Sequence, residues 1–194
     1  MNTTATAQES AQAEDGVWVF VFGELSMFTL LFATFLYYRA ASPDVYQASQ
    51  AALLHGMGAF NTLLLLASSY FVAASTAAMR RPDQSALALR RMRLAIACGV
   101  GFVLVKTLEY GHAFHAGHDV LSNGFFMFYF TLTGIHLMHV LVGLGLLGLL
   151  HTQLKNRHAE AGHVSPALIG FSTNFWHMVD IVWIVLFPLL YLLR

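Results

Sequence analysis

Four ionisable residues of this chain fall inside long apolar stretches, where a charge is expensive. They are Glu24, Lys106, Glu109 and Asp180. A charged side chain at the centre of a bilayer costs about 2.5 to 3.5 kcal/mol on insertion scales. Each of these residues must therefore be neutral, paired, close to a membrane surface or directed towards protein, and each is a candidate functional residue.

Lys106, Glu109 and Tyr110 are spaced i, i+3 and i+4, which places them on one face of a helix. We expect a paired polar group in which an ammonium, a carboxylate and a phenol hydroxyl satisfy one another. Because such a group is complete without a ligand, we interpret it as structural.

Glu24 stands alone in its stretch, because no Lys or Arg follows it before Arg39. It lies roughly 10 Å along a helix that rises about 1.5 Å per residue. Two interpretations stay open. Glu24 is either paired with a neighbouring helix near a membrane surface, or it is a protonated carboxyl facing a lipid-filled or wet cleft, with a lipid- or proton-related role.

The last two apolar stretches carry two further polar stripes, one with spacing i, i+3 and one with spacing i, i+4, i+7. With the tryptophans that border the second stripe, the residues are His136, His139, Thr173, His177, Asp180, Trp176 and Trp183. A short loop joins the two stretches, so their helices are antiparallel neighbours. We expect the stripes to face each other and to form a polar network that fixes helix packing.

Ten histidines also raise the alternative of a stand-alone membrane protein that binds haem b or a metal. Haem needs facing histidines at matched depth, or one histidine with an open site. The i, i+3 spacing of His136 and His139 differs from the i, i+4 spacing of zinc-binding helices, and no Glu-x-x-His motif accompanies it. The run of His112, His115 and His118 fits a polar outer loop better than a metal site. We therefore predict no catalytic residue, no metal site and no cofactor.

The composition excludes most soluble functions. Of 194 residues, 57% are hydrophobic and only 10% are charged, whereas soluble domains carry about 25% charged residues. Ten Lys and Arg balance ten Asp and Glu, which argues against a nucleic-acid partner. Cys98 is the only cysteine, so an internal disulfide and Cys-x-x-Cys motifs are excluded.

Five stretches are long enough to cross a bilayer as helices of roughly 20 residues. They cover residues 17–38, 53–79, 94–112, 125–150 and 167–193, and we expect residues 1–16 to form a disordered polar tail before one membrane domain, 17–194. The sequence thus predicts an all-α, five-helix bundle. Pro188 lies inside the last stretch and should kink that helix or mark its final turns.

The orientation follows from the basic residues of the connections. Those after the second and fourth stretches carry Arg80, Arg81, Arg90, Arg91, Arg93, Lys155 and Arg157, against Arg39 and Arg194 on the other side. Lys and Arg accumulate on the cytoplasmic side of membrane proteins. We expect a cytoplasmic N-terminus and a periplasmic C-terminus.

Several segments together resemble the haem-copper oxidase subunit III family. Trp176–Trp183 reads W-H-M-V-D-I-V-W, like the family's W-H-x-V-D-x-V-W, and Gly134–Val140 matches its G-x-H-x-x-H-V segment. Further matches are Glu109-Tyr110, Asn61-Thr62, and Glu24 at the place of the family's carbodiimide-reactive glutamate. The full-length form has seven spans. Among five-span forms the chain looks most like the accessory protein of nitric oxide reductase called NorE.

The resemblance implies a non-catalytic accessory subunit in a bacterial inner membrane, without haem or copper. Family members flank the catalytic subunit, hold phospholipid and support proton uptake and lifetime. The resemblance to NorE points to a nitric oxide reductase complex in denitrification. The alternative is subunit III of an aerobic terminal oxidase that uses cytochrome c or quinol.

Overall fold

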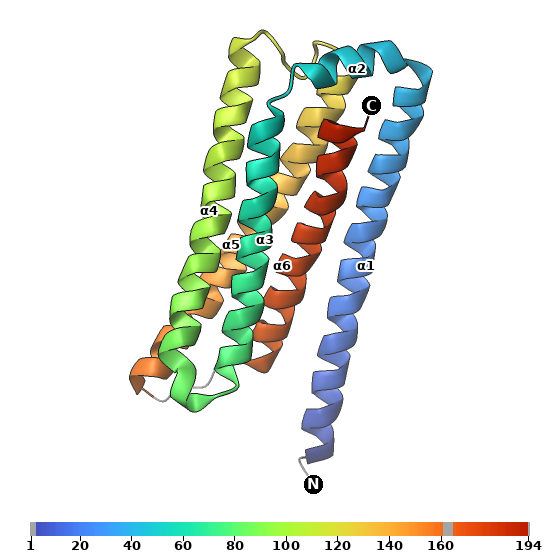
Figure 1. Ribbon diagram of the computed structural model, residues 1–194. Coiled ribbons are helices and arrows are strands. Elements are labelled where there is room, and N and C mark those ends of the chain that lie inside the picture. The colour runs from blue at the N-terminus through green and yellow to red at the C-terminus, as the bar shows by residue number, and fades with distance from the viewer. Residues whose placement is uncertain (1–2, 161–164, 194) are drawn as a thin grey trace.

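The computed structural model describes residues 3–160 and 165–193, and within them the chain is helical with no strand. Five long helices run side by side along one axis (Figure 1). They are α1 (Thr3–Ala41), α3 (His55–Met79), α4 (Ser85–His115), α5 (Gly124–Glu160) and α6 (Pro166–Phe187). The short helix α2 (Pro43–Ala51) lies across one end of the bundle. The predicted all-α class is confirmed.

Successive long helices run in opposite directions, so the two ends of the chain lie at opposite ends of the bundle (Figure 1). Among the described residues, four helices are long and apolar enough to cross a membrane: Gly16–Ala41, His55–Met79, Gly124–Asn156 and Pro166–Leu192. This set identifies a multi-pass membrane protein, but it holds four spans where the sequence predicts five. The long helix outside this apolar set is α4, which carries five charged residues: Arg90, Arg91, Arg93, Lys106 and Glu109.

The helix ends differ from the predicted ones in several places. Helix α4 begins at Ser85 and α5 continues to Glu160, beyond the predicted stretches 94–112 and 125–150. Helix α1 begins at Thr3, so the segment expected to be a disordered tail is helical from there on; its Ala, Gln and Glu are strong helix formers. Helix α6 ends at Phe187 and continues as the π-helix η2 (Pro188–Leu192), in which the Leu193 N–H donates to the Pro188 carbonyl at 2.9 Å. A proline cannot donate to the preceding turn, so Pro188 marks the final turns of this helix.

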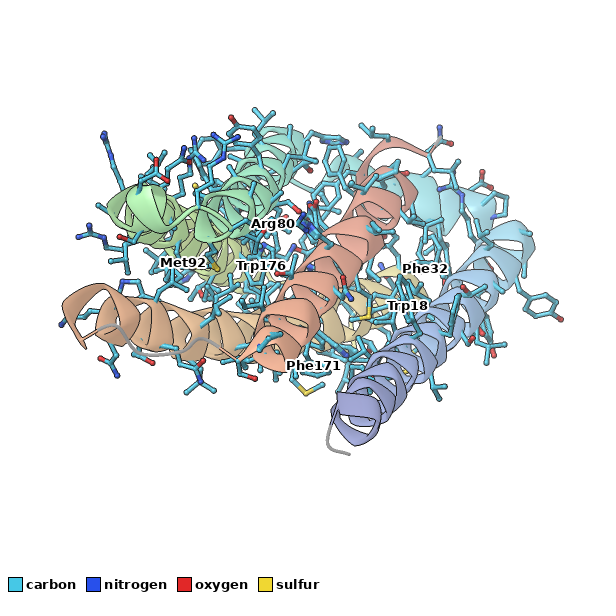
Figure 2. All side chains as sticks on the ribbon, turned by 90° about the horizontal axis from the view of Figure 1, so that it is seen from below. Trp18, Phe32, Arg80, Met92, Phe171 and Trp176 are labelled. Atoms are coloured by element: carbon cyan, nitrogen blue, oxygen red, sulfur yellow. The ribbon has the colours of Figure 1, made fainter. Side chains whose placement is uncertain are left out.

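Trp176 of α6 packs where α4, α5 and α6 meet, and its side chain is fully buried. A Cβ atom at Gly99 of α4 would lie 2.9 Å from its Cη2, and one at Gly143 of α5 would lie 2.7 Å from its Cε3. Figure 2, which looks along the bundle from the end opposite α2, places Trp176 between the helices. Two glycines on different helices thus make room for one indole ring.

Candidate functional site

The most deeply buried polar group joins α4, α5 and η2. Lys106 has no exposed surface. Its Nζ donates to Glu109 Oε2 at 3.1 Å, to the Tyr129 hydroxyl at 3.2 Å and to the Tyr191 hydroxyl at 2.8 Å. The two hydroxyls in turn donate to Glu109 Oε1. These four residues, the Lys106 cluster, satisfy one another, as buried charges require.

Tyr110 lies beside this cluster but takes a different partner from the one its spacing predicts. Its hydroxyl bonds Thr133 Oγ1 at 2.6 Å. Because Thr133 donates its own proton to the Tyr129 carbonyl at 2.6 Å, Tyr110 is the donor in this bond. The Tyr110 ring still faces Lys106, with 5.4 Å between Nζ and the ring centroid. The predicted Lys106–Glu109 pair therefore forms within α4, whereas the Tyr110 hydroxyl links α4 to α5 through Thr133.

A shallow pocket at the end of the bundle that carries α2 borders the Lys106 cluster. Its lining includes Glu109 and Tyr129 of the cluster, together with His112 and His118. The His118 ring stacks on Phe126 with centroids 4.3 Å apart. Across the described ranges, no three His, Cys, Asp or Glu side chains are grouped so that they could hold a metal ion.

Glu24 of α1 pairs with His139 of α5, 115 residues further along the chain. The Nε2 atom of His139 lies 3.0 Å from Glu24 Oε2, and its Nδ1 lies 2.8 Å from the Ile135 carbonyl. A carbonyl only accepts, so Nδ1 carries a proton. One further proton then lies between Nε2 and Oε2. The Glu24 side chain remains 22% exposed, so this shared proton lies near the outer surface of the bundle.

His136 does not face the polar stripe of α6 as the sequence predicts. Its ring is fully buried, with centroid distances of 5.7 Å to Phe102 and 5.1 Å to Trp183. Neither ring nitrogen has a hydrogen-bond partner among the described atoms, and the same holds for both amide atoms of buried Asn61. His136 thus contacts Trp183 of α6 through its ring face, and Trp183 Nε1 donates to Thr62 at 3.0 Å.

The polar stripe of α6 faces α3 instead. His177 Nδ1 bonds the hydroxyl of Ser69 at 2.5 Å, and Ser69 also interacts with the Asp180 carboxyl. The Thr173 hydroxyl and the Trp176 Nε1 have no partner in the part of the chain that the structure describes. The two predicted stripes therefore bind different helices: His139 binds α1, and His177 binds α3.

Residues that sequence reasoning missed complete both groups. Tyr129 and Thr133 precede His136 at i−7 and i−3, a spacing on one helix face that could have indicated them. Tyr191 and Ser69 carry no such signal, because they come from other helices. The assembled groups can hold fixed charges and one shared proton.

Comparison with known proteins finds similarity over nearly the whole chain. Residues 3–193 match the family model described as Cytochrome c oxidase subunit III. The chain is 32% identical over 181 residues to the Cytochrome c oxidase subunit 3 of Synechocystis sp., covering 92% of this chain and 74% of that protein.

Two relatives from Bacillus belong to different oxidases by name, one to a quinol oxidase and one to a cytochrome c oxidase. The Quinol oxidase subunit 3 of Bacillus spizizenii is 31% identical over 185 residues, covering 92% of this chain and 85% of the relative. The Cytochrome c oxidase subunit 3 of Bacillus sp. is 27% identical over 181 residues, covering 92% and 84%. These names favour the terminal oxidase alternative over the nitric oxide reductase expected from the resemblance to NorE.

Proposed function

This chain belongs to the cytochrome c oxidase subunit III family, and we propose that it is a non-catalytic accessory subunit of a bacterial respiratory haem–copper oxidase. It assembles with the catalytic subunit in the inner membrane and supports the stability and the proton or lipid environment of that subunit. The observation that carries the proposal is the family match over residues 3–193.

The polar groups of the bundle support a role without chemistry of its own. The Lys106 cluster is internally satisfied, and it ties α4 and α5 to the C-terminal turns through Tyr191. Removing one partner of a buried ion pair leaves an uncompensated charge, at a cost of about 3–5 kcal/mol. Such a group is suited to holding helices in register.

Five membrane crossings, with the N-terminus in the cytoplasm, form part of the proposal. Helix α4 runs along the same axis as the four apolar spans (Figure 1), and its two mid-helix charges are paired with each other in the interior. A span can carry buried, paired charges of this kind. The basic connections give the orientation; Arg194 and the side chain of Arg157 lie outside what the structure describes.

We assign the lipid- or proton-related role of this subunit to the Glu24–His139 pair. It lies within the apolar length of α1 and remains partly exposed on the side of the bundle. With one proton shared between them, the carboxyl and the imidazole form a net neutral pair, so the proton can move between Glu24 Oε2 and His139 Nε2 without placing a net charge in the bilayer.

The test is deletion of the gene in its host, followed by complementation. We expect membranes of the deletion strain to keep the haem–copper spectrum but to reduce oxygen more slowly, or to lose activity sooner during turnover, with recovery on complementation. A defect in nitric oxide reduction with unchanged oxygen reduction would instead assign the chain to a nitric oxide reductase. Unchanged rates and lifetimes for both reactions would overturn the accessory role.

A further inference from the structure

The end of the bundle opposite α2 concentrates positive charge where the apolar spans stop. The span of α3 ends at Met79, directly before Arg80 and Arg81. Lys155 lies near the same end of the bundle on α5. Residues 79–93 contain a single acidic residue, Asp83. Figure 2 looks at the bundle from this end and labels Arg80. This is the level at which a bilayer's headgroups meet its acyl chains.

A pocket opens at this level between α3, α4 and α5. It is shallow and open to the surroundings, and it is lined by Met79, Arg81, Ser85, Ala88 and Leu154. One part of the lining is a guanidinium and a hydroxyl-bearing residue, and the other part is a thioether, a methyl and an isobutyl group. A site with one polar and one apolar side fits a ligand that is itself amphipathic.

Among the described side chains, no ion pair joins a cation of this end to a carboxylate. The two ion pairs in the described ranges are Lys106–Glu109 and Glu24–His139, both away from this end. Arg93 of α4 and Lys155 of α5 both lie close enough to His151 to act on it electrostatically, so basic side chains of two helices lie near one another at this end. The positive field at the pocket is therefore available to an anion.

We propose that this pocket binds the headgroup of an anionic phospholipid from the adjacent leaflet. Arg81 donates hydrogen bonds to the phosphate, and the nearby cations attract its charge. Met79, Ala88 and Leu154 contact the glycerol and the first acyl carbons. Basic pockets between membrane helices bind anionic headgroups in this way, and a guanidinium matches phosphate geometry. The site is independent of which respiratory complex the chain joins.

Binding is measured on the full-length chain purified in a neutral detergent, delipidated and titrated with phosphatidylglycerol. The readout is the thermal unfolding midpoint, together with retained lipid in native mass spectrometry. Phosphatidylcholine tests the need for net negative charge, and inorganic phosphate tests whether a free anion suffices. We expect a saturable rise of the midpoint with phosphatidylglycerol only.

Arg81→Gln and Arg90→Gln form a matched pair, because each removes one positive charge. Arg90 lies two residues beyond Ala88, about 200° around α4, and is exposed outside the pocket lining. We expect Arg81→Gln to weaken phosphatidylglycerol binding by about fivefold or more and Arg90→Gln to change it by less than about twofold. Both variants must first match the unliganded midpoint of the parent chain.

Three results would overturn the proposal. Equal weakening by the two variants would indicate diffuse surface charge without a site. Equal binding of phosphatidylcholine would remove the role of anionic charge. A saturable, Arg81-dependent response to inorganic phosphate of the same size would assign the pocket to a free anion. A variant that fails to fold is replaced by the alanine variant at the same exposed position, Arg81→Ala or Arg90→Ala, and judged by the same criteria.

Discussion

Replacing Gly143 by alanine should destabilise the bundle, because Trp176 fills the space that the new methyl group needs. The added Cβ would lie 2.7 Å from Trp176 Cε3, 3.0 Å from Cζ3 and 3.4 Å from Phe175 Cε1. The indole has no room to retreat, since Gly99 approaches it on α4 with a Cβ position 2.9 Å from Cη2. Overpacking of this kind costs about 1–3 kcal/mol.

Alanine also has the higher helix propensity, by about 0.8–1.0 kcal/mol, and this gain offsets part of the clash. The matched control is Gly145→Ala on the same helix, where an added Cβ has no atom within 4 Å. The control receives the propensity gain alone and should be neutral or more stable. The two variants should therefore differ by about 1–3 kcal/mol, with opposite signs relative to the parent chain.

The assay is thermal or denaturant unfolding of each variant in the same detergent, with helicity as the readout. Adding Trp176→Phe, which frees space, should reduce the extra cost of the alanine at position 143 in a double-mutant cycle. If Gly143→Ala proved as stable as Gly145→Ala, the close packing of the indole against α5 would be refuted.

Three more outcomes follow from the contacts described above. Reporter fusions after Arg81 and after His118 should report opposite sides of the membrane, and the same side for both would contradict a membrane-crossing α4. Tyr191→Phe removes bonds to the buried Lys106 cluster and should cost about 1–3 kcal/mol in unfolding experiments, whereas Tyr37→Phe, at an exposed tyrosine, should cost nothing measurable. A hydrophobic carbodiimide should label Glu24, as judged by peptide mass spectrometry, and Glu24→Gln should abolish that labelling; labelling of another carboxyl in its place would refute the assignment.

The sequence predicts the helices well, because each depends on a local run of apolar residues. The predicted stretch 53–79 and the observed α3 at His55–Met79 differ by two residues at one end. The proline at position 188 is a local signal too, and η2 begins there. Local patterns also indicate the Lys106–Glu109 pair, since three residues separate its members along one helix.

The spacing of residues along one helix does not predict which residues of other helices they will contact. Nothing in the spacing of His139 indicates that its partner is Glu24, 115 residues away, and not a polar residue of α6. Which side of a helix meets which neighbour depends on how the large side chains pack. Here the His136 ring packs against Trp183, with centroids 5.1 Å apart, and forms no hydrogen bond to the described polar residues of α6.

The central claim is that the chain serves a haem–copper oxidase without carrying the chemistry itself. The most direct measurement is affinity purification of the tagged chain from host membranes, beside the same chain expressed alone, with absorption spectra and metal content of both. We expect haem, copper and the catalytic oxidase subunit with the chain from host membranes, and a colourless, metal-free protein when the chain is expressed alone. A stoichiometric Soret band or bound metal in the chain expressed alone, or recovery from host membranes without the oxidase, would contradict it.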